Sequence, residues 1–208
     1  MRIDSLSSAP DRAGRFRVQF SDGTVMRLYR QTVEDFSLYT GCEMTEDAYA
    51  KLREAAGQMS AKMRAVRIVS ASSVSCKDLE RRLVQKGEDP RQAKAAVEWM
   101  EDLNLLDDRE TARQVVERCI RKGYGLARAK QALYEKRIPK EFWEDTLQDY
   151  PDQSDEICDF LREKLSEDSD PREVKRAIDA LIRRGHSYGL IRRCLGQLRF
   201  DTDDLPEG

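Results

Sequence analysis

Apolar residues recur at the spacing of α-helices along most of the chain after residue 45. In one stretch they stand at positions i, i+3, i+4, i+7 and i+8, which lie on one face of a helix. That stretch contains Ala112, Val115, Val116, Cys119 and Ile120. The pattern predicts a mainly α protein whose helices bury narrow apolar stripes.

The N-terminal region follows a different pattern. Residues 16–20 alternate between apolar and polar side chains, Asp22-Gly23 is a hairpin turn signal, and a second alternating stretch covers 24–30. This predicts a small N-terminal β-hairpin. Because an isolated two-stranded hairpin is marginally stable, we expect it to pack on a helical segment at 32–39 or on the long helix that follows.

Helix ends carry the clearest local signals. Asp107 stands where its side chain can cap a helix N-terminus, with Glu110 at the third helical position, and Gly123 stands where a left-handed residue ends the same helix. Asp89 and Asp170, each followed by a proline, repeat the start signal. These positions predict where three helices begin.

The helical part repeats itself weakly, with a period of about 50 residues. Leu83, Leu133 and Leu181 are equivalent, as are Gly87 and Gly185. Stacked copies bury apolar faces that one copy would expose, so we expect tandem three-helix repeats forming an elongated, curved array. The predicted divisions are an N-terminal extension with a hairpin and helix at 1–57, repeats at 58–106, 107–154 and 155–200, and an acidic tail at 201–208.

The total charge does not identify a class of partner. The chain holds 37 basic and 39 acidic residues, for a net charge of -2, which argues against strong binding to nucleic acid by charge alone. No apolar run approaches the ~20 residues that span a bilayer, and the residues after Met1 form no hydrophobic signal region. We expect a soluble, cytoplasmic protein without a membrane contact.

Residues suited to catalysis or metal binding are sparse. The five cysteines include no CxxC pair, the single histidine is His186, and there is no GxxxxGK[ST] loop. Asp107 and Asp108 could be paired acids, but neighbouring residues at a helix start point in different directions, and a cap explains the first. Gly123-Tyr124-Gly125 could cradle a phosphate, but a turn between helices needs the same glycines. We expect no enzyme activity, no metal and no cofactor, and a turn position for His186.

Exposed cations are the remaining candidates for a site. A solvated face with i,i+4 ion pairs explains any single one, whereas clusters offer groups that suit carboxylates on a protein or phosphates on DNA. Trp99 and Trp143 are expected to pack between helices rather than to stack on bases. The candidate residues for binding a partner or DNA form two clusters along the chain. The first is Arg113, Arg118, Arg121, Lys122, Arg128 and Lys130, and the second is Arg183, Arg184, Arg192, Arg193 and Arg199.

Several of these features occur together in one known family. The chain resembles the RecX family at 105–112, at Arg118, at 121–125 and at 131–136, within a similarity that runs from residue 67 to residue 200. The residues that match the family's structural motif are Asp107, Asp108, Ala112, Gly123, Gly125 and Leu133. Three positions depart from it: Thr111, Ala129 and Arg137 stand where the family usually has an aromatic residue, an isoleucine and a glycine.

The resemblance implies a bacterial regulator of the RecA recombinase. It implies that the repeats bind the RecA–single-stranded DNA nucleoprotein filament, inhibit the ATPase activity and strand exchange of RecA, and limit filament extension. Single- or double-stranded DNA is a further candidate contact, and we expect the chain to be a monomer. The alternative function is a helical-repeat module that binds nucleic acid directly, with a basic helix against the DNA backbone.

Overall fold

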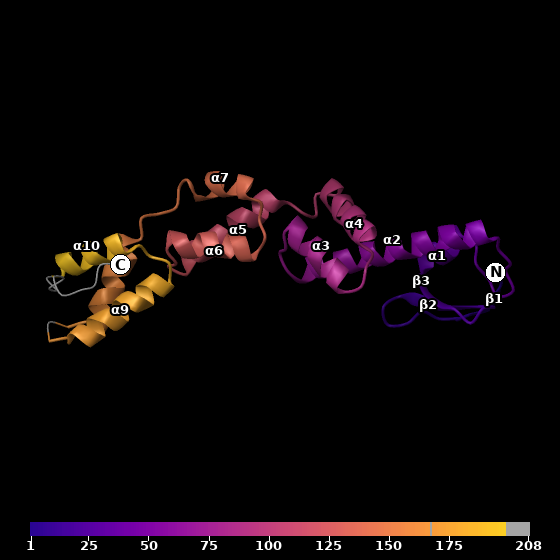
Figure 1. Cartoon of the computed structure of the whole chain (residues 1–208), viewed down its shortest axis with the longest axis horizontal. Helices are drawn as coiled ribbons and strands as arrows, with labels where there is room; N and C mark the ends of the chain where they lie inside the picture. The colour runs from indigo at the N-terminus through magenta and orange to yellow at the C-terminus, as the bar shows by residue number, and fades with distance from the viewer. Residues whose placement is uncertain (167, 199–208) are drawn as a thin grey trace. The chain divides into compact units, whose positions relative to one another are not determined.

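The computed structural model describes residues 1–166 and 168–198, which form ten α-helices, one short 3-10 helix and three strands (Figure 1). Arg199 and the predicted acidic tail lie outside the described residues. The chain separates after Leu106 into two compact units. The prediction of a mainly helical protein is confirmed, and none of the described helices combines the length and the apolar character needed to cross a membrane.

The N-terminal sheet has three antiparallel strands in the order β1-β2-β3: Ile3–Leu6, Arg15–Phe20 and Val25–Tyr29. The predicted hairpin is the β2–β3 pair, and Gly23 in its turn has a φ of 86°. The sheet has one strand more than the predicted hairpin, because β1 pairs with β2 from Ile3 to Leu6. This strand has only four residues, too few to show a clear alternation of polar and apolar side chains.

Two helices cover the sheet. The first, α1 (Arg30–Asp35), ends earlier than the predicted segment at 32–39, because Ser37 turns the chain with a φ of 48°. The second, α2 (Glu46–Ala71), contributes Leu52 to the core between sheet and helices, where Phe20 and Tyr49 meet edge to face at 5.0 Å.

Helix α2 also builds the first repeat. Its second half buries Ala61 and Ala65 against α3 (Cys76–Gln85) and α4 (Pro90–Asp102). The helix therefore runs without a break across residues 57 and 58, where the sequence suggested a division between the extension and the first repeat. One continuous helix serves both cores.

The C-terminal unit contains two three-helix repeats, each with its own core. In the second repeat, Ala112 is fully buried and Trp143 packs against the same core, which confirms a packing role for this tryptophan. Its indole also donates a hydrogen bond to the Ile138 carbonyl at 3.0 Å. The helices of the second repeat are α5 (Asp108–Arg121), α6 (Leu126–Glu135) and α7 (Trp143–Leu147), with a 3-10 turn at Lys140–Phe142. Those of the third are α8 (Ser154–Lys164), α9 (Pro171–Arg183) and α10 (Tyr188–Gln197).

The predicted helix caps are confirmed. The Asp107 carboxylate accepts hydrogen bonds from the backbone amides of Arg109 and Glu110, at 2.8 and 3.0 Å. Asp89 caps α4 in the same way, and Asp170 forms a reciprocal capping box with Glu173. The cap explains Asp107 without any acid–base chemistry.

The second helix of each repeat ends in the same backbone geometry. The residue that follows the helix C-cap is left-handed in all three copies, with φ values of 90° at Gly87, 57° at Arg137 and 87° at Gly185. In each copy the next amide donates to the carbonyl of a fully buried leucine, as in the bond from Ile138 to Leu133 at 3.1 Å. The predicted equivalence of Leu83, Leu133 and Leu181 therefore corresponds to a shared helix ending.

In the second repeat the left-handed position is occupied by Arg137, whereas the other two repeats have glycine there. We expect Arg137→Gly to raise the free energy of unfolding by roughly 0.5–1 kcal/mol, because relief of about 1–2 kcal/mol of left-handed strain exceeds the entropy that glycine gains in the unfolded chain. Urea denaturation followed by circular dichroism measures this. Arg137→Lys, which keeps the charge and the strain, serves as the control, and an equal gain in that variant would contradict the explanation.

Candidate interaction surface

Two glycine loops hold the second and third repeats together. The Gly125 amide donates to the Arg184 carbonyl at 2.9 Å, and the Ala127 amide donates to the Gly185 carbonyl at 3.2 Å. A Cβ atom on Gly125 would lie 2.1 Å from the Gly185 oxygen, and one on Gly185 would lie 2.3 Å from the Arg128 nitrogen. Only glycine at both positions allows the backbones to approach this closely.

This contact gathers cations that the sequence places far apart. Lys122 and Arg128 flank the Gly125 loop, and Arg183 and Arg184 precede Gly185. The four side chains line one hollow of about 480 Å³, together with Tyr124 and Ala180. We call this hollow the basic junction. The two candidate clusters predicted from the sequence thus contribute to one surface.

The cations of the basic junction differ in their contacts. Arg128 forms an ion pair with Glu135 at 3.0 Å, and this hydrogen bond raises the pKa of the guanidinium. The Arg184 guanidinium lies 4.7 Å from the centre of the Phe160 ring, and the Lys122 ammonium lies 5.9 Å from that of Tyr124. Lys122, Arg183 and Arg184 are exposed, and no ion pair holds them within the described part of the chain. They are available to an anionic partner.

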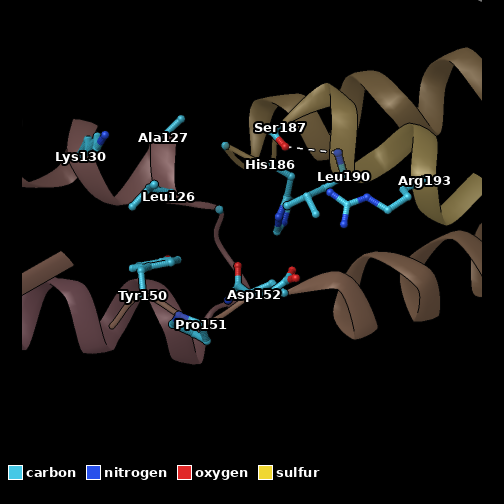
Figure 2. A pocket seen from close by; sticks show the side chains of 13 residues that line it. Leu126, Ala127, Lys130, Tyr150, Pro151, Asp152, His186, Ser187, Leu190 and Arg193 are labelled. Atoms are coloured by element: carbon cyan, nitrogen blue, oxygen red, sulfur yellow. Dashed lines mark hydrogen bonds between the residues drawn. The ribbon is translucent and has the colours of Figure 1, made fainter. Parts of the chain in front are cut away.

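The other predicted cations do not join this surface. Lys130 and Arg193 line a second hollow between α6 and α10, shown in Figure 2. Arg113 forms an ion pair with Glu110 at 3.7 Å and lines a third hollow beside Arg109. Three more candidates, Arg118, Arg121 and Arg192, are exposed on their helices. Arg199 lies outside the described residues.

His186 is part of the contact between the two repeats. It is buried, and its Nε2 lies 3.0 Å from the Gly123 carbonyl oxygen, so the neutral ring donates from this nitrogen. Burial lowers its pKa below the ordinary 6.5, against the opposing effect of the hydrogen bond to Gly123. The turn position predicted for this histidine is confirmed, and its ring joins two loops.

The titration of His186 predicts a loss of stability in acid. The folded pKa is depressed, so the unfolded chain takes up the proton first as the pH falls. The contribution of neutral His186 to the free energy of unfolding is fully present above about pH 6.5 and declines as the pH falls below that value. His186→Gln keeps an Nε2–H donor without a titrating ring. We expect the free energy of unfolding to fall less in this variant than in the parent between about pH 7.5 and 5.5. Urea denaturation at several pH values measures how steeply the free energy of unfolding falls in each protein. Identical slopes against pH would show that His186 does not cause the loss of stability.

Thiol and metal chemistry find little support in the described residues. Cys119, Cys158 and Cys194 are buried, and all five cysteines are free thiols. Burial raises the pKa of Cys119, and it is the largest cause that raises the pKa of Cys194 to about 12. Nowhere in the described ranges do three or more His, Cys, Asp or Glu side chains gather as metal ligands would.

Two features of this region have no signal in the sequence. The Tyr150 hydroxyl donates to the Tyr124 carbonyl at 2.5 Å, and burial raises the pKa of this tyrosine to about 12. Gln153 is buried in the linker between the repeats. Both depend on contacts between segments far apart in the chain, which local pattern does not report.

The structure thus defines a helical protein of three-helix units, whose exposed cations suit contact with another macromolecule. Residues 107–147 match the family described as "RecX, second three-helix domain". The chain is 26% identical over 149 residues to the regulatory protein RecX of Vibrio parahaemolyticus, covering 70% of this chain and 94% of that protein. It is 24% identical over 198 residues to that of Clostridioides difficile, covering 92% and 93%.

Solved structures share the fold. The crystal structure of a regulatory protein RecX superposes with a TM-score of 0.62 at 19% identity, over 92% of this chain and 98% of the other. RecX from Lactobacillus salivarius superposes with a TM-score of 0.61 at 21% identity, over 69% and 97%. In sequence and in fold the chain is similar to proteins of the RecX family. The prediction of a regulatory protein rather than an enzyme agrees with this family.

Proposed function

We propose that the chain binds the RecA–single-stranded DNA filament, as a cytoplasmic monomer, and inhibits the ATPase activity, strand exchange and filament extension of RecA. The similarity to regulatory proteins of the RecX family supports the choice of partner. The observation that carries the mode of binding is the basic junction, where cations of two repeats meet on one surface.

The physical argument concerns charge and rigidity. The contact between the two loops fixes the backbone that carries these cations, so binding has to order their side chains but not the two loops relative to each other. Complementary charges speed encounter and fix register. Carboxylates on the surface of a RecA filament and phosphates of its DNA are both suitable anions.

Direct binding to nucleic acid is the second candidate function. The basic junction favours it, because exposed Arg and Lys side chains neutralise phosphates. The net charge of -2 opposes it, since non-specific DNA binding depends on an excess of positive charge.

One experiment separates the two functions. Labelled single-stranded DNA is mixed with the purified full chain, with and without RecA and ATP, at low and high salt. We expect the chain to sediment with preassembled RecA filaments and to slow their DNA-dependent ATP hydrolysis, while binding to bare DNA stays weak. Tight, steeply salt-dependent binding to bare DNA, without an effect on RecA, would replace the proposed function by the second one.

A further inference from the structure

Gln153 presents a buried side-chain amide at the start of α8. Its side chain is only 3% exposed, and neither Nε2 nor Oε1 finds a partner within the described ranges. Buried polar atoms in native proteins are nearly always paired, so such a group calls for an explanation. Gln153 belongs to the linker before α8 and lines the hollow between the second and third repeats.

The hollow has the chemistry of a binding groove for peptide. Its volume is about 570 Å³, and its apolar walls come from α6, the linker and α10, through Leu126, Tyr150, Pro151 and Leu190. Figure 2 shows these side chains around a common space, with Lys130 and Arg193 on opposite sides of it. The Tyr150 hydroxyl is already bound to Tyr124, which leaves its ring as an apolar wall. We call this hollow the repeat groove.

We propose that the repeat groove binds an extended segment of a partner protein, with an apolar side chain in the groove and an acidic residue beside it. On binding, the Gln153 side chain turns from its buried position toward the groove, where its one acceptor and pair of donors can bond the N–H and the C=O of a peptide backbone together. The walls accept the apolar side chain, and Lys130 or Arg193 pairs with the neighbouring carboxylate. The inference goes beyond the proposed function, because it specifies the chemistry of the bound segment without fixing the partner's identity.

A protein segment fits this groove better than a nucleic acid does. Asp152 also lines it, and its carboxylate is fixed at the start of α8 by hydrogen bonds from the Ser154 amide and hydroxyl, at 3.1 and 2.6 Å. A fixed negative charge repels phosphates. It can accept a backbone N–H of a peptide, and the two cations of the groove can still meet a carboxylate.

The free protein supplies a first test. Methionine has nearly the shape of glutamine without its polar atoms, so Gln153→Met removes an unsatisfied amide. We expect the thermal midpoint of the variant to rise by about 2–4 °C, because burial of an unpaired amide destabilises the free protein and methionine removes that amide. Gln148→Met, at an exposed position outside the groove, is the matched control and should leave the midpoint unchanged.

The binding test uses a random 12-residue peptide display library, panned on the immobilised full chain. We expect enrichment of peptides with an apolar residue next to Asp or Glu, whose affinity falls at least tenfold on Gln153→Met and stays unchanged on Gln148→Met. A labelled 12-residue dT oligonucleotide is measured on the same three proteins, and its affinity should not depend on Gln153.

The outcomes separate this inference from the proposed function. Failure to enrich any peptide that depends on Gln153 would overturn it, as would an oligonucleotide that loses affinity in Gln153→Met. A midpoint lowered by that substitution would show that the amide is satisfied in the free protein, by water for instance, and would also count against it. Sedimentation of the parent with RecA filaments is measured in parallel and tests the proposed function alone.

Discussion

Gly185→Ala is expected to lower the free energy of unfolding of the C-terminal unit by roughly 2–5 kcal/mol. A left-handed residue with a Cβ atom costs about 1–2 kcal/mol, and forced overpacking costs about 1–3 kcal/mol. Both apply at this position, where φ is 87° and the added atom would lie 2.3 Å from the Arg128 nitrogen. That neighbour is backbone on a helix, so it cannot move aside as a flexible side chain would.

Two other glycines provide controls for this result. Gly87 follows the equivalent helix of the first repeat with a φ of 90°. No atom of the described residues lies within 4 Å of its added Cβ, so Gly87→Ala measures the backbone strain alone. Gly189 lies in α10, also with nothing nearby, and its alanine variant should gain roughly 0.5–1 kcal/mol. A loss in Gly185→Ala no larger than in Gly87→Ala would contradict the contact between the loops.

Tryptophan fluorescence can assign each loss to its unit. The chain has two tryptophans, Trp99 in the N-terminal unit and Trp143 in the C-terminal one. Urea denaturation in a Trp99→Phe background reports on Gly185→Ala and Gly189→Ala, and a Trp143→Phe background reports on Gly87→Ala. If the unfolding transition shifted in the unit that does not contain the substituted glycine, the destabilisation would not arise from the local contacts of that glycine.

Reversing charge in the basic junction is expected to weaken binding to RecA filaments by roughly 10- to 100-fold. The double variant Lys122→Glu, Arg183→Glu alters one cation from each repeat, and like charges opposed across an interface cost several kcal/mol. Both side chains are exposed, so the fold should persist, with a small loss from the glutamates near two helix C-termini. Inhibition of the DNA-dependent ATPase activity of RecA, titrated against protein concentration, measures the effect.

The matched control carries the same change of net charge elsewhere. Arg53→Glu, Arg91→Glu reverses two exposed arginines of the N-terminal unit, and circular dichroism verifies the fold of both double variants. Neutralisation by Lys122→Gln, Arg183→Gln should give an intermediate loss. Inhibition that is equal for the parent and the junction variant, or lost equally in the control, would remove the basic junction from the binding surface.

The helical repeats were predictable because their signals are local. Asp107 and Asp170 cap helices where the sequence indicated, and Leu133 and Leu181 are fully buried at equivalent positions. Caps and apolar stripes depend on residues within a few positions of one another, so the sequence carries them directly. The strand β1 was not predicted, because its order comes from backbone pairing with β2 rather than from its own residues.

The candidate site was predictable only in part. Lys122, Arg128, Arg183 and Arg184 were all predicted as exposed cations, but as members of two clusters. Their meeting in one hollow depends on the approach of two backbones, and a glycine in the sequence does not reveal which segment it will face.

The sequence by itself determined where three capped helices begin and that Gly123 ends one of them in the left-handed conformation, because these properties arise from the chemistry of neighbouring positions. The tertiary structure decided that Gly125 meets Gly185, and so that cations of two repeats share one surface. It also left the Gln153 amide buried, with no hydrogen-bond partner among the residues that the structure describes. These outcomes depend on contacts between distant segments, where burial and close packing are properties of the folded chain.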